Sequence, residues 1–442
     1  MVQSLIFAVV LITGFYIFIK HIKDLRKTIF LGRKIDRSDQ KKERWKHMIR
    51  VALGQSKMVK RPIAGFLHIL VYIGFIIINL EVLEIIVDGL LGTHRCFAFL
   101  GGFYDVLIGS FEILAVLVII AVLLFWLRRN LVRIRRFWNP EMAGFPKNDA
   151  NYILYFELVL MSLFLLMNAA DFHLQGIDQV SNHYIKAGSF PKSSMITPMF
   201  ESFSYDTVVL IERVAWWLHI VGILIFLNYL YYSKHLHIIL AFPNTFYADL
   251  NPLGKVDNLE SVKKEVELMM DPNADPFAVS DDTQPQEEPQ RFGAKDVFDL
   301  NWVQLLNAYT CTECGRCTSS CPANQTGKLL SPRKIMMDTR DRLEEVSKNI
   351  RQNKGVFKDD GKTLLNDFIS KEELWACTSC NACVEECPVS ISPLSIIMDM
   401  RRYLVMEESA APSELNNMMS NIENNGAPWP YNQMDRLNWK ND

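Results

Sequence analysis

The stretch CTECGRCTSSCP at residues 311–322 recurs, with the same spacing of its cysteines, as CTSCNACVEECP at residues 377–388. Both runs follow the pattern C-x2-C-x2-C-x3-C-P, which spaces thiolates to bind the irons of [4Fe–4S] clusters. A zinc site pairs two separated C-x2-C units around one tetrahedral ion, so two identical four-cysteine runs favour iron over zinc. The two runs therefore predict two [4Fe–4S] clusters.

In this pattern the first three cysteines of a run bind one cluster, and the fourth binds the cluster of the other run. A crossed arrangement of this kind keeps the two clusters a short electron hop apart. The predicted ligands are Cys311, Cys314, Cys317 and Cys387 for one cluster, and Cys377, Cys380, Cys383 and Cys321 for the other.

The 55 residues between Cys321 and Cys377 indicate helices around the clusters. Segments 331–352 and 362–377, and residues 390–408 after the second run, have the composition of helices. We expect residues 296–410 to form an α-helical two-cluster ferredoxin domain and the whole chain to be all-α.

Apolar residues are concentrated before residue 242, although the chain of 442 residues has a net charge of only −2. About 20 apolar residues cross a bilayer as a helix. The first candidate lacks a basic region before its apolar core, so we expect a retained anchor rather than a signal peptide. Residues 1–240 are thus predicted to form a bundle of five transmembrane helices, with the spans at 3–19, 63–87, 107–127, 151–170 and 207–232.

Basic residues predict the orientation, because cytoplasmic loops carry an excess of Lys and Arg. Residues 20–61 hold 15 basic and 4 acidic residues, and residues 128–147 hold 6 and 1. Loops 88–106 and 171–206 hold only 3 basic residues together. We expect a multi-pass protein of the bacterial cytoplasmic (inner) membrane, with its N-terminus outside and its iron–sulfur domain in the cytoplasm, where thiols stay reduced. The ninth cysteine, Cys96, stands alone and is expected to be inert.

Histidines in or beside the apolar segments are candidate haem ligands, because neutral imidazole is a common axial ligand. His68 lies near the cytoplasmic end of the second segment and His219 near the outer end of the fifth, while His235 and His237 follow the fifth. On one continuous helix His219 and His237 would stand roughly 27 Å apart, so they could serve two haems but not one. By depth, His68 suits His237, and His173 lies nearest to His219. Alternatively, these histidines are interfacial hydrogen-bonding residues.

Two further segments are polar. Residues 241–295 are predicted to be an acidic linker, because residues 256–292 hold 10 acidic and 3 basic residues and cannot bury enough apolar surface to fold alone. This linker is either a strap along a partner or a plain disordered tether. Residues 411–442 are predicted to be a docking tail, the alternative being a frayed terminus.

The iron–sulfur half resembles the corresponding domain of heterodisulfide-reductase-type and fumarate-reductase-type electron-transfer subunits. The membrane half resembles the cytochrome b subunit of respiratory nitrate reductase. The phrases that carry the resemblance are RPIAGFLH (61–68), WWLH (216–219), SKHLHI (233–238) and ENNGAPWP (423–430). Together they resemble membrane-bound iron–sulfur oxidoreductases that link soluble flavoproteins to the quinone pool.

The resemblance implies that His219 and His237 on the fifth helix and His68 on the second helix are ligands of one or two b-type haems. The second helix of that cytochrome family carries two histidines about ten residues apart. In this chain Met58 and Ile78 stand ten residues on either side of His68. One of the two haems is therefore expected to be missing or to be held differently.

The function implied is electron transfer between a cytoplasmic dehydrogenase, flavoprotein or CCG-type partner and a membrane quinone, in either direction. The sequence has no CC pair, so a CCG-type module is expected on a separate subunit. Basic residues at 57–61, near His68, are the candidate quinone contact. We find no nucleotide loop, catalytic triad or flavin motif, and we expect no nucleic-acid partner. The alternatives are a subunit of a heterodisulfide-reductase-like thiol–disulfide reductase and a haem-free membrane anchor for a ferredoxin domain.

Overall fold

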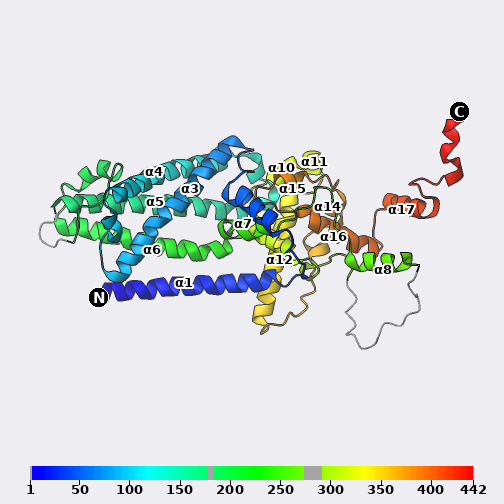
Figure 1. Ribbon diagram of the computed structural model, residues 1–442, viewed down its shortest axis with the longest axis horizontal. Helices are drawn as coiled ribbons and strands as arrows, with labels where there is room; N and C mark the ends of the chain where they lie inside the picture. The colour runs from blue at the N-terminus through cyan, green and yellow to red at the C-terminus, as the bar shows by residue number, and fades with distance from the viewer. Residues whose placement is uncertain (1, 178–182, 273–290, 442) are drawn as a thin grey trace.

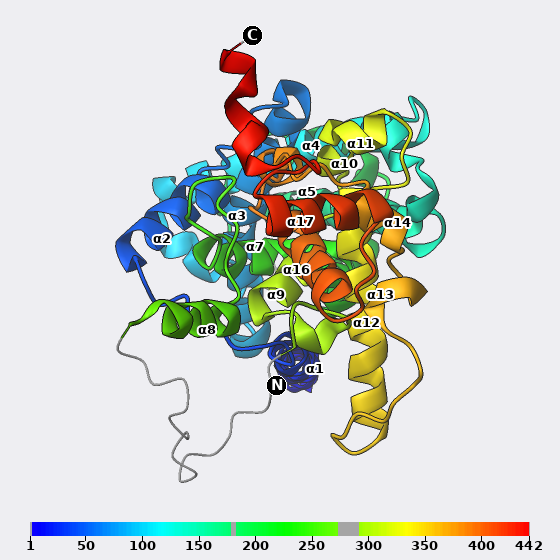
Figure 2. The ribbon, with the colours of Figure 1, turned by 90° about the vertical axis from the view of Figure 1, so that its right-hand side faces the viewer.

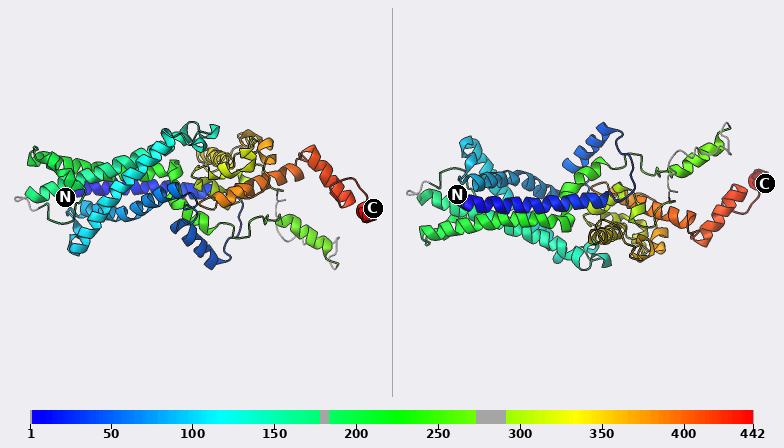
Figure 3. Two further views of the ribbon diagram at one scale, coloured as in Figure 1. Left: turned by 90° about the horizontal axis from the view of Figure 1, so that it is seen from above. Right: turned by 90° about the horizontal axis from the view of Figure 1, so that it is seen from below.

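The computed structural model describes residues 2–177, 183–272 and 291–441, which form an elongated molecule (Figure 1). Within these ranges every regular element is a helix, so the all-α prediction is confirmed. The two ends of the chain lie at opposite ends of the long axis, as the views from above and below show (Figure 3).

Five helices are long and apolar enough to cross a membrane, and each contains one predicted segment. All five extend beyond the predicted limits, because a helix continues into polar residues after its apolar core ends. They are α1 (Val2–Ile29), α3 (Pro62–Leu91), α4 (Gly102–Asn130), α5 (Phe145–Ile177) and α6 (Tyr205–Tyr229), the last continued by a 3-10 turn to Tyr232.

The five long helices form a closed ring. α4 packs between α3 and α5, α5 packs against α6, and α1 lies between α6 and α3. Phe7 of α1 contacts Trp216 and Trp217 of α6, with ring centroids 5.2 and 5.9 Å apart. Gly89 of α3 permits this packing, because a Cβ there would lie 2.5 Å from the Phe7 ring. The outward surface of the ring is apolar, as a lipid-facing surface requires.

The C-terminal half is a second helical unit. Its long helices are α12 (Pro332–Gln352) and α16 (Pro393–Met406), which match two of the three predicted helical segments. The third, 362–377, is not one continuous helix. Leu365 (ψ 131°) and Asn366 (φ +77°) are non-helical within the short element 364–367, and the next helix begins at residue 371, after the extended Ser370. The other helices are α9 (Trp302–Thr310), α10 (Arg316–Ser320), α11 (Pro322–Gln325), α13 (Leu364–Asp367), α14 (Lys371–Trp375) and α15 (Ala382–Glu386).

This second unit packs on the end of the ring that carries the basic loops (Figure 1). Thr28 at the end of α1 hydrogen-bonds Ser347 of α12 across 2.8 Å. Arg333 of α12, fully buried, donates to Glu141 at 2.7 Å. The basic loops and the cysteine runs therefore lie on the same side of the ring, and the N-terminus lies on the other.

The fifth long helix does not continue to His237 as one helix. Ser233 is extended, with φ −107° and ψ 147°, and His237 begins a new helix, α7 (His237–Phe246). α7 packs against α9 and buries Leu240 and Asn244, so the predicted linker boundary at residue 241 falls inside an ordered interface.

Two peripheral helices lie near the far end of the second unit. α8 (Glu260–Met270) belongs to the predicted linker, and the rest of that prediction, residues 273–290, lies outside the described residues. α17 (Ser413–Asn425) and a 3-10 helix at Gln433–Lys440 form the predicted tail (Figure 2). Neither has a buried residue.

Candidate functional site

The two cysteine runs share one backbone conformation. Glu313 and Ser379, which hold equivalent positions in the runs, have φ values of +53° and +56°. Gly315 and Asn381, also equivalent, have φ values of +70° and +61°. These residues with positive φ turn each loop around its thiols. The two loops end at the short helices α10 and α15, which pack against each other.

The first set of thiols lines one cavity of about 370 Å³, part of it open to the outside. Cys311, Cys314 and Cys317 come from the first run and Cys387 from the second, and Cys383 of the other set also lines this cavity. After burial, the thiols that most strongly raise the pKa of Cys317 are Cys314, Cys311 and Cys387, ahead of Cys383. This is the grouping that crossed ligation requires.

The second set shows the complementary grouping. Burial raises the pKa of the Cys383 thiol to about 12, and Cys377, Cys321 and Cys380 are the thiols that raise it further. Cys321 belongs to the first run, so it has crossed to the thiols of the second. Of the eight, only Cys380 is exposed, which brings the second set to the surface.

Burial disfavours the thiolate form at both sets. It raises the pKa of Cys311 to about 12 and that of Cys387 to about 11. A bound metal reverses this by taking the proton's place. Two backbone donors already point at sulfur: the Ser379 N–H lies 3.4 Å from Cys377 Sγ, and the Ile391 N–H lies 3.3 Å from Cys387 Sγ. Such bonds stabilise a ligated thiolate and tune its potential.

His68 and His237 face each other between the ring and the second unit. Their ring centroids lie 6.3 Å apart. A metal held between two imidazole nitrogens at roughly 2 Å from each would place the centroids about 6 Å apart. The Nδ1 atom of His237 donates to the Lys234 carbonyl at 3.0 Å, which orients the ring, and Nδ1 of His68 is buried with no partner in the described residues.

A large cavity of about 1320 Å³, part of it open to the outside, surrounds these two rings. Its first end borders the cysteine runs through Cys314, Glu313 and Arg316, and its other end lies within the membrane helices at Tyr72, Phe75 and Glu157. The cavity therefore connects one cysteine set with His68 and His237.

Two further residues line this cavity. His235, a candidate histidine that the resemblance did not include among the ligands, is a third imidazole on the cavity wall, with its ring centroid 5.4 Å from that of His237. Burial lowers the pKa of His235 to about 3, so it is neutral. Glu157, which was not predicted as a site residue, reaches the cavity from α5. An acidic residue within an apolar segment is a signal that the sequence contained.

His219 lies apart from the other predicted ligands. It is 1% exposed, and its Nδ1 donates to the Leu160 carbonyl at 3.0 Å. Among the described side chains its aromatic neighbour is Phe164, and His173, its expected partner, packs against Phe200 instead. The structure thus brings together two of the three predicted haem ligands.

The basic residues at 57–61 contact the iron–sulfur unit. Lys60 pairs with Glu385, and Arg61 lies 3.4 Å from Glu386. The Arg316 guanidinium donates to the carbonyl oxygens of Lys57 and Met58 at 2.9 and 3.2 Å. These residues join the ring to the iron–sulfur unit. Their partners therefore do not support the expectation that they contact a quinone.

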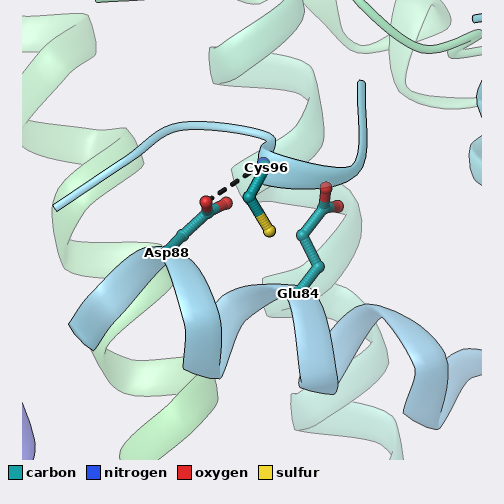
Figure 4. Close-up of side chains that lie close together, drawn as sticks. All are labelled: Glu84, Asp88 and Cys96. Atoms are coloured by element: carbon teal, nitrogen blue, oxygen red, sulfur yellow. Dashed lines mark hydrogen bonds between the residues drawn. The ribbon is translucent and has the colours of Figure 1, made fainter. Parts of the chain in front are cut away.

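A buried polar network at the end of the ring away from the second unit was also not predicted. The Arg95 guanidinium donates to Asp171 at 2.7 and 2.9 Å and to Glu81 at 3.3 Å. Beside it, Glu84, Asp88 and Cys96 lie close together (Figure 4). Burial, followed by Asp88 and Glu84, raises the pKa of the Cys96 thiol to about 12. Both carboxylates already accept hydrogen bonds, Glu84 from Tyr104 and Asp88 from the Cys96 N–H.

Comparisons with known proteins agree with the cysteine geometry. Residues 307–391 match the 4Fe-4S dicluster domain, so this part of the chain is an iron–sulfur domain. No solved structure matches the chain.

Two relatives match nearly the whole chain. The probable iron-sulfur-binding oxidoreductase FadF of Bacillus subtilis is 30% identical over 472 residues, which cover 100% of this chain and 61% of FadF. The EtfAB:quinone oxidoreductase of Syntrophomonas wolfei is 26% identical over 446 residues, which cover 94% of this chain and 56% of that protein. This chain therefore spans about 60% of the length of these relatives.

A third relative matches a shorter part of the chain. It is one of the subunits of the ferredoxin/F(420)H(2)-dependent CoB-CoM heterodisulfide reductase of Methanosarcina acetivorans. The two chains are 32% identical over 120 residues, which cover 27% of this chain and 60% of the relative. The chain is thus related to iron–sulfur oxidoreductases and to heterodisulfide reductase subunits.

Proposed function

We propose that this chain is an electron-transfer subunit that connects a soluble redox partner with a membrane quinone. In this proposal the two cysteine sets hold two [4Fe–4S] clusters, and His68 and His237 hold one b-type haem. Clusters and haem, when bound, take up and release single electrons. The observation that carries the proposal is the large cavity, because Cys314 lines it together with His68 and His237.

The order of the sites supports a path through the protein. Cys380 of the second set is exposed, so that set is accessible to a soluble partner. The first set is more deeply placed and borders the large cavity. We propose that the second set would hold the cluster that exchanges electrons with the soluble partner, and that the first set would hold the cluster nearer to His68 and His237. Electron flow in either direction would use the same sites.

The donor set fits a haem. The 6.3 Å separation of the His68 and His237 rings leaves room for one metal between them. The hydrogen bond from His237 Nδ1 to a backbone carbonyl is the usual outer contact of a metal-bound imidazole. The Nδ1 atom of His68 is buried and has no hydrogen-bond partner among the described residues.

We place the iron–sulfur domain in the bacterial cytoplasm and the N-terminus outside. The support is that the cysteine runs pack on the end of the ring that carries the basic loops, which favour the cytoplasmic side. An oxidising compartment would instead favour disulfides between such cysteines.

The partner is proposed to be a flavoprotein or a CCG-type subunit. The name of the Syntrophomonas relative pairs EtfAB with a quinone, which supports a soluble donor on one side and a quinone on the other. Residues 411–442 are the proposed docking tail, because aromatic and apolar side chains there are exposed, including Trp429, Tyr431, Met434 and Trp439.

A second candidate is a subunit of a thiol–disulfide reductase. The similarity of part of this chain to a heterodisulfide reductase subunit favours it. Reoxidation of the reduced clusters by a disulfide rather than by a quinone would distinguish this candidate.

The test is a reduced-minus-oxidised visible spectrum of the purified, detergent-solubilised chain, with iron and haem measured per chain. We expect a sharp b-type α-band and about 8 non-haem iron atoms, the content of two cubane clusters. In His68→Ala and His237→Ala the α-band should disappear while the non-haem iron remains. A wild-type protein with this iron content and no haem would overturn the haem part and leave a membrane-anchored ferredoxin.

A further inference from the structure

More imidazole side chains line the large cavity than one haem would bind. A haem iron offers two axial positions, and three imidazoles line the cavity: His68, His235 and His237. An unused imidazole donor therefore lies beside the candidate haem ligands.

The end of the cavity remote from the cysteines lies within the membrane helices. Val71, Tyr72 and Phe75 occupy consecutive turns of α3 after His68 and line this end. Phe75 is also 42% exposed on the surface of a helix that is apolar enough to span a bilayer. The cavity wall at this end is thus also part of the lipid-facing surface, so a lipophilic ligand can enter from the bilayer.

Glu157 differs from the other membrane carboxylates. Glu81, Glu84 and Asp171 each accept a hydrogen bond from Arg95, Tyr104 or another donor. Glu157 lines the cavity from α5 and makes no hydrogen bond or ion pair with any described residue. An unpaired charge is costly at membrane depth, so an ionisable group there is a candidate for proton transfer.

We infer that this end of the cavity binds the headgroup of a lipophilic quinone, with Glu157 and Tyr72 contacting one carbonyl and His235 the other. The His235 imidazole and the Tyr72 hydroxyl can each donate a hydrogen bond. The inference rests on the proposed function in one respect, since the clusters are taken as the source of electrons.

The reaction balances with groups already named. Two electrons from the clusters and two protons convert the two C=O groups of the quinone into two C–OH groups. Protonated Glu157 gives one proton to the nearer carbonyl oxygen, and a proton taken up from the aqueous phase goes to the other carbonyl oxygen. A second proton from the aqueous phase then restores Glu157. The hydroquinone then leaves toward the bilayer.

The experiment uses the full chain in detergent and the quinol analogue 2-heptyl-4-hydroxyquinoline N-oxide, whose fluorescence is quenched on binding. The variants are Glu157→Gln and Tyr72→Phe. The control is Glu201→Gln, an exposed glutamate in the loop before α6. Haem and iron content are measured in every sample.

We expect wild type and Glu201→Gln to bind the analogue equally. Glu157→Gln and Tyr72→Phe should bind it about tenfold more weakly or worse, the effect of one lost hydrogen bond in a desolvated site. Their haem and iron content should equal that of wild type. Equal binding by wild type, Glu157→Gln and Tyr72→Phe, or no binding by wild type, would overturn the inference.

The outcomes also separate this site from the haem. If wild type lacks haem and the two variants still weaken binding, the quinone site stands and the haem proposal fails. If haem is present and the variants bind normally, the haem proposal stands and the quinone site is elsewhere.

Discussion

Glu313, which stands between two cysteines of the first run, forms a buried ion pair with Lys234, three residues before His237. The side chains are 2% and 9% exposed. The Lys234 carbonyl accepts the hydrogen bond from His237 Nδ1, and Arg340 adds a second cation 2.7 Å from Glu313. One lysine thus links the loop of the first cysteine set to a candidate haem ligand.

Replacing Lys234 with methionine should destabilise the protein strongly. Loss of one partner of a buried ion pair costs about 3–5 kcal/mol, because the remaining charge stays buried. Since Arg340 still pairs with Glu313, we expect the lower end of this range, seen as a lower thermal midpoint in far-ultraviolet circular dichroism.

The matched control is Lys371→Met. Lys371 pairs with Glu408 at 2.9 Å, but the side chains are 42% and 25% exposed, and such pairs contribute at most about 1 kcal/mol. Equal thermal midpoints for Lys234→Met and Lys371→Met would show that the buried ion pair contributes no more to stability than the exposed one.

Crossed ligation predicts which cluster depends on which distant cysteine. Cys387→Ala should remove the cluster of the first run, although Cys387 belongs to the second run. The electron paramagnetic resonance spectrum of reduced Cys387→Ala should therefore match that of Cys314→Ala. If it matches Cys380→Ala instead, each run binds its own cluster.

His219 should be dispensable for haem. Its ring packs on Phe164 rather than on another histidine among the described residues, so no second imidazole faces it. His219→Ala should keep the haem content of wild type in a pyridine haemochrome assay, whereas His68→Ala should lose it. Loss of half the haem in His219→Ala would reveal a second haem site.

Gly315→Ala should impair the first cysteine loop. Its φ of +70° strains any L side chain by about 1–2 kcal/mol, and a Cβ would lie 2.6 Å from the buried Arg333 guanidinium. We expect lower iron content and a lower thermal midpoint. Asn381→Gly, at the equivalent position of the second run, is the control and should be tolerated, because glycine adopts its φ of +61° freely.

Cys96 should resist alkylation. Its raised pKa of about 12 leaves roughly one thiol in ten thousand ionised at pH 8, and only the thiolate reacts. Reactivity should appear only as the pH approaches 12. Peptide mapping after iodoacetamide treatment measures this, and Asp88→Asn should increase labelling, because it removes the carboxylate that most raises the pKa. Rapid labelling of wild type at pH 8 would contradict the prediction.

The sequence by itself determined the cofactor chemistry and the helical spans. Eight cysteines in two identical runs are a local pattern, and five apolar segments are long enough to act as helices without reference to the rest of the chain. For the same reason α12 and α16 were predictable. The segment 362–377 was not, because its composition does not reveal the non-helical backbone of Leu365 and Asn366.

Only the tertiary structure decided which distant side chains share a site. The bend at Ser233 places His237 on a new helix opposite His68 and leaves His219 alone, a result that residue spacing along an assumed straight helix could not give. The packing of the iron–sulfur unit on the ring encloses Cys314, His235 and Glu157 in one cavity. These residues are far apart in sequence, and contacts of this kind depend on how whole helices pack rather than on local propensity.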